Sequence, residues 1–77
     1  MEDAPGPTLR GLREAAGIHT LEQAADRTGL DYTTIGKLEN GKVPNPRIGT
    51  FERLAGAYGC DVADVLAAWK RSLAEAA

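Results

Sequence analysis

Residues 20–42 have the sequence TLEQAADRTGLDYTTIGKLENGK, in which a glycine separates two stretches that favour helix. Thr20 and Gln23, three residues apart, form the pattern of a capping box, in which the side chains bind free amides at a helix start. A helix is therefore expected from Thr20 to about Thr28. Gly29 can adopt the left-handed backbone conformation that ends many helices, so we expect a turn there.

The second half of this stretch predicts another helix, over residues 31–40. Asp31 is a favourable N-cap, and Gly41 is a favourable stop. Ile35 and Leu38 are three residues apart, which puts both side chains on one face of the helix. That face is expected to be buried.

The spacing across the turn is the one that a helix-turn-helix requires. Ala25 is small where two helices would cross closely, and Gly29 follows four residues later. Leu30 can fill the angle between the helices, with Ile35 and Leu38 on the inner face of the second helix. Two such helices cross at roughly 90–120°. Alanine and glycine are also common in other helical hairpins, so the spacing alone leaves an ordinary hairpin open.

The rest of the chain divides into three further segments with helical character. Thr8 can cap a helix that stops at Gly17. Another helix is expected to begin near Arg47 and to end at Gly59, and Asp61 can cap the last one. Apolar residues recur at helical spacing in these last two, namely Ile48, Phe51, Leu54, Ala55 and Tyr58, and then Val62, Val65, Leu66, Trp69 and Leu73. No stretch shows the alternation of a strand, so we predict an all-α bundle of five short helices.

Composition limits the classes of protein to which this chain can belong. Seventy-seven residues make a single domain, and 43% hydrophobic with 26% charged residues is typical of a soluble globular one. No apolar run approaches the ~18 residues that a membrane span needs. The N-terminal MEDAPGP lacks the features of a signal peptide. We therefore expect a cytoplasmic protein with no membrane association.

An enzyme is not expected, because groups that catalyse or bind metals are scarce. The chain has one cysteine, Cys60, and one histidine, His19, whereas zinc clusters need three or four such ligands. No recognised motif combines a nucleophile with a base or pairs two carboxylates. We expect no catalytic residue, no metal site and no cofactor.

Charge is unevenly distributed along the chain. The net charge is −2, which by itself argues weakly against binding to nucleic acid. Within residues 32–53, however, the charged residues are Lys37, Lys42, Arg47 and Arg53 against Glu39 and Glu52. The middle of the chain is therefore locally basic.

Three pieces of the chain resemble the phage repressor and Cro-type helix-turn-helix domains, also called the xenobiotic-response-element-like family: LRGLREAAGI, TLEQAADRTGLDYTTIGKLENGK and NPRIGTFERLAGAYGCDVADVL. The resemblance implies an all-α, five-helix, lambda-repressor-like DNA-binding domain over residues 8–70. Residues 1–7 would be a flexible tail, and residues 71–77 the end of the fifth helix or a tail. In this family the helix matching residues 31–40 enters the major groove of double-stranded DNA, usually as part of a dimer on a twofold operator.

The resemblance also implies which residues of helix 31–40 contact DNA bases. The base-contacting positions are occupied by Tyr32, Thr33, Thr34 and Lys37. Lys37 can donate to guanine acceptors, and Thr33 offers a hydroxyl group together with a methyl group for thymine. Tyr32 could instead be a surface aromatic residue packed on a neighbouring loop.

Contacts to the DNA backbone are implied at four further positions, Thr20, Asn40, Lys42 and Arg47. Thr20 belongs to a helix start, where free N–H groups bind anions. Such contacts would set the orientation on DNA and the salt dependence rather than the sequence preference. Each of these side chains could instead be a solvated surface residue.

An acidic residue, Glu39, falls within this basic region. The resemblance implies that Arg13 on the first helix pairs with it, so we expect an Arg13–Glu39 ion pair. Leu21 stands where relatives usually have Gln, and Ala24 where they usually have Leu, so Leu21 is interpreted as compensating for lost core volume. Gly36 is interpreted as an exposed position that lets the helix approach DNA closely.

The sequence thus predicts a sequence-specific DNA-binding transcriptional regulator, most simply a repressor. A homodimer is expected, either stable in solution or assembled on DNA, because two linked sites bind more tightly than one. The alternative is a protein-interaction module with a protein partner, such as an antitoxin or a transcriptional adaptor. The operator sequence, the dimer interface and any effector or partner protein do not follow from these patterns.

Overall fold

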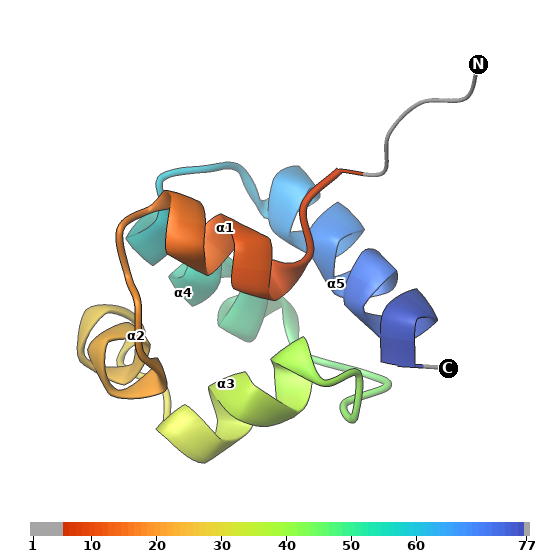
Figure 1. The fold of residues 1–77 in the computed structure, drawn as a ribbon, viewed down its shortest axis with the longest axis horizontal. Helices are drawn as coiled ribbons and strands as arrows, with labels where there is room; N and C mark the ends of the chain where they lie inside the picture. The colour runs from red at the N-terminus through yellow and green to blue at the C-terminus, as the bar shows by residue number, and fades with distance from the viewer. Residues whose placement is uncertain (1–5, 77) are drawn as a thin grey trace.

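The computed structural model describes residues 6–76, and five helices make up the fold of this part of the chain (Figure 1). They are α1 (Leu9–Ala15), α2 (Leu21–Thr28), α3 (Tyr32–Glu39), α4 (Ile48–Tyr58) and α5 (Val62–Ala76). No strand is present within the described residues, and the prediction of an all-α bundle is confirmed. Residues 71–76 continue α5, while residues 1–5 of the predicted tail lie outside the described part of the chain.

The helix starts follow the capping residues of the sequence. The hydroxyl oxygens of Thr8 and Thr20 accept hydrogen bonds from backbone amides in the first turns of α1 and α2. In the predicted capping box, the amide of Gln23 donates to Thr20 at 3.1 Å, but the Gln23 side chain accepts from the amide of His19 instead of that of Thr20. Two capping predictions are corrected. Asp31 is the N-cap residue of α3, yet its side chain makes no capping hydrogen bond. Before α5, the amide of Asp61 donates to the carboxylate of Asp64 at 3.2 Å.

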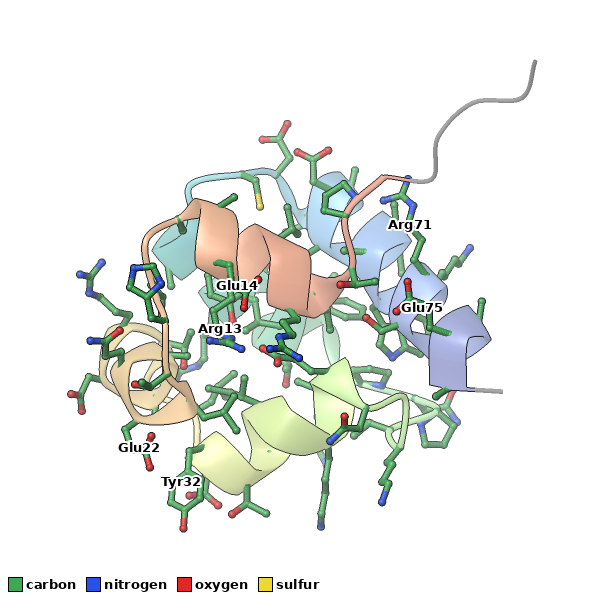
Figure 2. The ribbon with its side chains drawn as sticks, in the orientation of Figure 1. Arg13, Glu14, Glu22, Tyr32, Arg71 and Glu75 are labelled. Carbon is green, nitrogen blue, oxygen red and sulfur yellow. The ribbon has the colours of Figure 1, made fainter. Side chains whose placement is uncertain are left out.

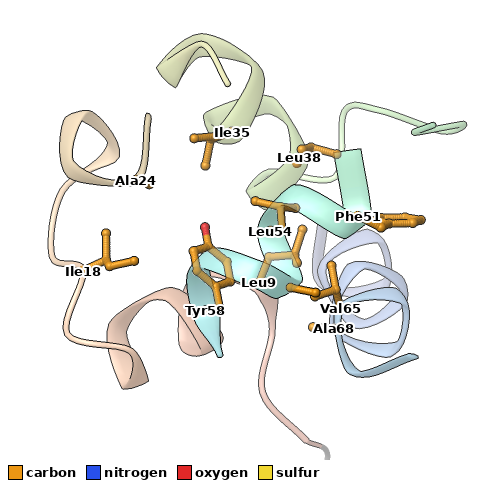
Figure 3. Packing of buried hydrophobic residues seen from close by; sticks show 11 residues of the cluster. Leu9, Ile18, Ala24, Ile35, Leu38, Phe51, Leu54, Tyr58, Val65 and Ala68 are labelled. Carbon is orange, nitrogen blue, oxygen red and sulfur yellow. The ribbon is translucent and has the colours of Figure 1, made fainter. Parts of the chain in front are cut away.

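The core is formed by the inner faces of all five helices (Figure 3). Its apolar residues are Leu9, Ile18, Ala24, Ile35, Leu38, Phe51, Leu54, Ala55, Tyr58, Val65 and Ala68. The two predicted apolar stripes are wrong at two positions, because Ile48 is 63% exposed and Leu66 is 37% exposed. Ile48 is the first residue of α4, whereas Phe51 and Leu54 further along the helix are buried.

α3 lies at the outside of the bundle and packs on three other helices. Its main neighbour is α2, and it also contacts α1 and α5. Figure 1 shows α3 along one edge of the molecule, with the other helices gathered on one side of it. The fold thus supports α3 from one side and leaves its other side facing solvent.

Candidate nucleic-acid interface

The turn between α2 and α3 is formed by Gly29. Its φ of 77° lies in the left-handed region, where glycine has no steric penalty, and its amide donates to the carbonyl oxygen of Ala25 at 2.9 Å. The side-chain oxygen of Thr28 accepts a hydrogen bond from the amide of Leu30 at 3.1 Å. Leu30 is half-buried and packs against the core. Local hydrogen bonds therefore define the angle between the two helices.

α4 also contacts this turn, through Arg53, which stands out in the sequence only as one of the cations in residues 32–53. Arg53 Nη1 donates to the backbone carbonyl oxygen of Thr28 at 3.3 Å. Because Thr28 is the last residue of α2, this cation stands at the negative end of the helix dipole. The partners are 25 residues apart, so no local pattern indicates the contact.

α3 has a buried face and an open face. Ile35 and Leu38 are each 1% exposed and belong to the core. The exposed side chains of the helix include Tyr32, Thr33 and Lys37. Figure 2 shows Tyr32 pointing away from the bundle. Thr34 is half-buried. The residues expected to contact bases therefore lie together on one helix, with Thr34 the least accessible of them.

The expected Arg13–Glu39 ion pair joins α1 to the last residue of α3. The guanidinium group donates to both carboxylate oxygens of Glu39, at 2.7 and 3.3 Å. It also donates to the carbonyl oxygen of Ile18 at 3.1 Å. The side chains of Arg13 and Glu39 are only 6% and 9% exposed, and hydrogen bonding to Glu39 raises the pKa of Arg13. The acid is thus held by α1 within the protein.

Gly36 has a different role from the one expected. It is half-buried instead of exposed, and the side chain of Leu21 from α2 lies beside it. A Cβ atom added at Gly36 would be 3.3 Å from Leu21 Cδ1. Leu21 packs against the core one helical turn before Ala24, which is completely buried. The missing side chain of Gly36 therefore makes room for the leucine of the neighbouring helix. An approach of DNA is not needed to explain it.

The four residues expected at the DNA backbone are all exposed and lie near helix ends. Thr20 is the N-cap of α2, Asn40 is the C-cap of α3 and Arg47 is the N-cap of α4. Lys42 lies between α3 and α4, and its amide donates to the carbonyl oxygen of Lys37 at 2.9 Å. Both of these cations therefore belong to the connection that follows the open face of α3.

Two other features are absent from residues 6–76. No group of three or more His, Cys, Asp or Glu residues is placed to hold a metal ion. No helix combines the length and the apolar character that crossing a membrane requires.

Comparison with the sequences of known proteins identifies the family. The model of a family described as a helix-turn-helix domain matches residues 6–69, which is most of the chain. The chain belongs to the helix-turn-helix family. The matched segment begins before α1 and ends within α5, so it covers α1 to α4 and the first part of α5, and not only α2 and α3. The resemblance to the repressor and Cro type is confirmed.

One curated relative of this helix-turn-helix domain is the uncharacterized HTH-type transcriptional regulator RghRB of Bacillus subtilis (strain 168). The two sequences are 36% identical over 63 residues, which cover 82% of this chain and 45% of the relative. The matched part is therefore less than half of the relative's length. No solved structure matches the helix-turn-helix domain described here.

Proposed function

We propose that this helix-turn-helix domain binds double-stranded DNA sequence-specifically, as a transcriptional regulator with α3 in the major groove. The observation that carries the proposal is the two-sided character of α3. Its buried face, with Ile35 and Leu38, joins it to the core, and its exposed face is free to meet a ligand. The major groove of B-DNA admits an α-helix, and the second helix of a helix-turn-helix motif is the one that enters it.

The open face of α3 carries groups suited to base edges. Lys37 is exposed and can donate to O6 and N7 of guanine. Thr33 is exposed as well, and its methyl and hydroxyl groups suit thymine and polar base edges. Tyr32 is 51% exposed at the start of α3, and Thr34 would contact DNA only from the margin of this face. We propose these four residues as the base-contacting set.

Contacts to phosphates are proposed for the helix ends beside this face. Thr20 and the first amides of α2 form one such site, and Asn40, Lys42 and Arg47 form the other, after α3. Each cation that neutralises a phosphate releases counterions, so the affinity should fall as salt rises. The net charge of −2 does not oppose this, because binding depends on the charge of the contacting surface.

The regulator is proposed to act as a cytoplasmic repressor that occludes a promoter. One α3 offers few base-contacting side chains, so a homodimer on a twofold operator would supply the remaining specificity. DNA can itself assemble such a dimer, because two adjacent half-sites raise the effective concentration of the second copy.

The test is selection of binding sites from random duplex DNA, followed by measurement of Kd at several salt concentrations. We expect a pseudo-palindrome with half-sites about one turn (~10 base pairs) apart. Lys37→Ala should relax the preference at one base position by about 1–3 kcal/mol. Lys42→Ala should weaken binding to every sequence and lower the salt slope by about one. The matched control is Lys70→Ala, which removes the same charge from an exposed position on α5 and should change neither property.

Failure to enrich any sequence at low salt would contradict DNA binding and would favour a protein partner, as in an antitoxin or a transcriptional adaptor. Light scattering of the chain, which has a mass of 8.1 kDa, tests the dimer separately. Two copies on each selected operator are expected. One copy on each operator would contradict the homodimer and leave DNA binding intact.

A further inference from the structure

Residues 40–47 connect α3 to α4 and are called the 40–47 loop from here on. We propose that α5 positions this loop for DNA binding, and that Trp69 is the positioning residue through which it does so. The proposal rests on the proposed function, because it assumes that Lys42 in the loop contacts a phosphate. It assigns a role in DNA binding to a helix for which no DNA contact is expected.

Trp69 makes the hydrogen bond that holds the middle of the 40–47 loop. Its indole N–H donates to the carbonyl oxygen of Val43 at 3.0 Å. Pro44 and Pro46 have no amide hydrogen to donate. Among the residues that the structure describes, this is the only hydrogen bond made by residues 43–46. The hydrogen bonding of residues 43–46 therefore depends on one side chain of α5.

The indole ring is itself held in a defined orientation. Trp69 is half-buried and packs against Phe51 of α4, with the ring centroids 5.7 Å apart and the ring planes inclined by 57°. A tilted arrangement at this distance is favourable for two aromatic rings. The donor therefore meets the loop at a fixed place on the surface of the core.

Gly41 gives α5 a second contact with the loop. A Cβ atom added at Gly41 would lie 2.7 Å from Ala76 Cβ, 3.1 Å from the Ser72 carbonyl oxygen and 3.3 Å from Leu73 Cα. No side chain fits into this space, so the loop backbone lies directly on the last turns of α5. Ser72 is in turn joined to α1, because its hydroxyl oxygen accepts a hydrogen bond from the amide of Leu9 at 3.1 Å.

Lys42 lies between these two contacts. Gly41 before it packs on α5, and Val43 after it is hydrogen-bonded to Trp69. The backbone on each side of the lysine is therefore held by α5, while the amide of Lys42 itself donates to the Lys37 carbonyl oxygen of α3. α3 itself is positioned separately, by its buried face and by its ion pair with α1. Releasing the loop should weaken the phosphate contact and leave the base preference unchanged.

The variant that tests this is Trp69→Phe, which removes the donor and keeps an aromatic ring against Phe51. We expect weaker binding to the selected operator and to an unrelated duplex by the same factor, about two- to tenfold, the range that one hydrogen bond represents. The salt slope should fall towards that of Lys42→Ala. The selected base sequence should not change. Combined with Lys42→Ala, the variant should cause little further loss, because both act on one contact.

A loss of stability has to be distinguished from this positioning role. The control is Val65→Ala, which creates a cavity in the buried face of the same helix and leaves the loop contacts in place. Val65→Ala should lower Tm in thermal unfolding. Its salt slope of DNA binding, measured at a temperature where both variants are folded, should equal that of the wild type. Hydrogen exchange gives a direct measurement: the Lys42 amide, bonded to the Lys37 carbonyl oxygen, should exchange faster in Trp69→Phe than in Val65→Ala.

Two results would overturn the positioning role: a wild-type salt slope in Trp69→Phe, or an affinity loss that adds fully to that of Lys42→Ala. A Lys42→Ala variant with an unchanged slope would overturn it too, while the proposed function would stand if the wild type still selects an operator. If the wild type selects no sequence at all, the proposed function itself fails. The two failures are therefore distinguishable.

Discussion

The two ends of α3 are held by different means. At its N-terminal end, the turn at Gly29 is closed by hydrogen bonds between close neighbours in the sequence, such as that from Leu30 to Thr28. At its C-terminal end, Glu39 is bonded to Arg13 of α1, and the loop that follows α3 is bonded through Val43 to Trp69 of α5; the partners in each pair are 26 residues apart. The angle at which α3 leaves α2 is thus mainly a local property, whereas the position of its far end depends on the tertiary structure.

The largest expected effect is at the C-terminal end, in the ion pair. Glu39→Gln should lower the free energy of unfolding by about 3–5 kcal/mol, because it leaves the buried Arg13 guanidinium without a counter-charge. Urea denaturation measures the loss. Replacing both members by apolar residues should cost less than this single change, since no charge then stays buried.

The exposed pair Arg10–Glu14 provides the matched control. Its atoms are 3.2 Å apart, but its side chains are 70% and 49% exposed. Glu14→Gln should therefore cost only about 0–1 kcal/mol. Equal losses of unfolding free energy at Glu14 and Glu39 would show that the buried Arg13–Glu39 pair stabilises the fold no more than an exposed pair does. The contrast between the two ends of α3 would then weaken.

The second prediction compares the glycines that follow α2 and α3. Gly29 and Gly41 both have positive φ, which costs a side-chain-bearing residue about 1–2 kcal/mol. A new Cβ at Gly41 also meets the backbone of α5, whereas one at Gly29 meets only the flexible tip of Arg53, at 2.8 Å. Gly41→Ala should therefore cost about 3 kcal/mol or more, and Gly29→Ala about 2 kcal/mol.

Gly59→Ala is the control for backbone strain, because its φ is 69° and a new Cβ would have nothing within 4 Å. Its cost in urea denaturation should be that of the left-handed conformation alone, about 1–2 kcal/mol. If Gly41→Ala and Gly59→Ala cost the same, the close contact of the 40–47 loop with α5 is not energetically important.

The smallest effect is expected at the N-terminal end of α3. Arg53→Met keeps most of the side-chain stem but removes the hydrogen bond to Thr28, so we expect a loss of about 1 kcal/mol. Arg27→Met is the control, since this residue is also a cation in the last turn of α2. Thermal unfolding of the two variants should differ, with the lower Tm for Arg53→Met. Identical Tm values would mean that the turn is held by its own residues alone.

Much of the fold could be predicted from the sequence because its determinants are local. Capping residues and glycines indicate where the helices begin and end, and the spacing of Ile35 and Leu38 indicates which face of α3 is buried. The Arg13–Glu39 pair is different, since no spacing rule links the two residues. It was expected only because of the family resemblance.

The features that the sequence did not indicate depend on neighbours in space. Ile48 continues the apolar spacing of α4 but remains exposed at the first residue of the helix, although Phe51 in the same turn is buried. The space at Gly36 is taken by a residue of another helix, which a linear pattern does not reveal. The bonds made by Trp69 and Arg53 likewise join segments 25 or 26 residues apart. Tertiary packing, and not helix propensity, decides all of these.

The contact of Leu21 with Gly36 limits how the specificity of this domain can be changed. A simple redesign would replace α3 alone with the corresponding helix of another regulator. Any residue other than glycine at position 36 would bring a Cβ atom to 3.3 Å from Leu21, close enough that the leucine side chain must shift by a few tenths of an ångström. Exchanging positions 21 and 36 together avoids this shift, so the redesign includes a residue of α2 as well as the helix proposed to contact DNA.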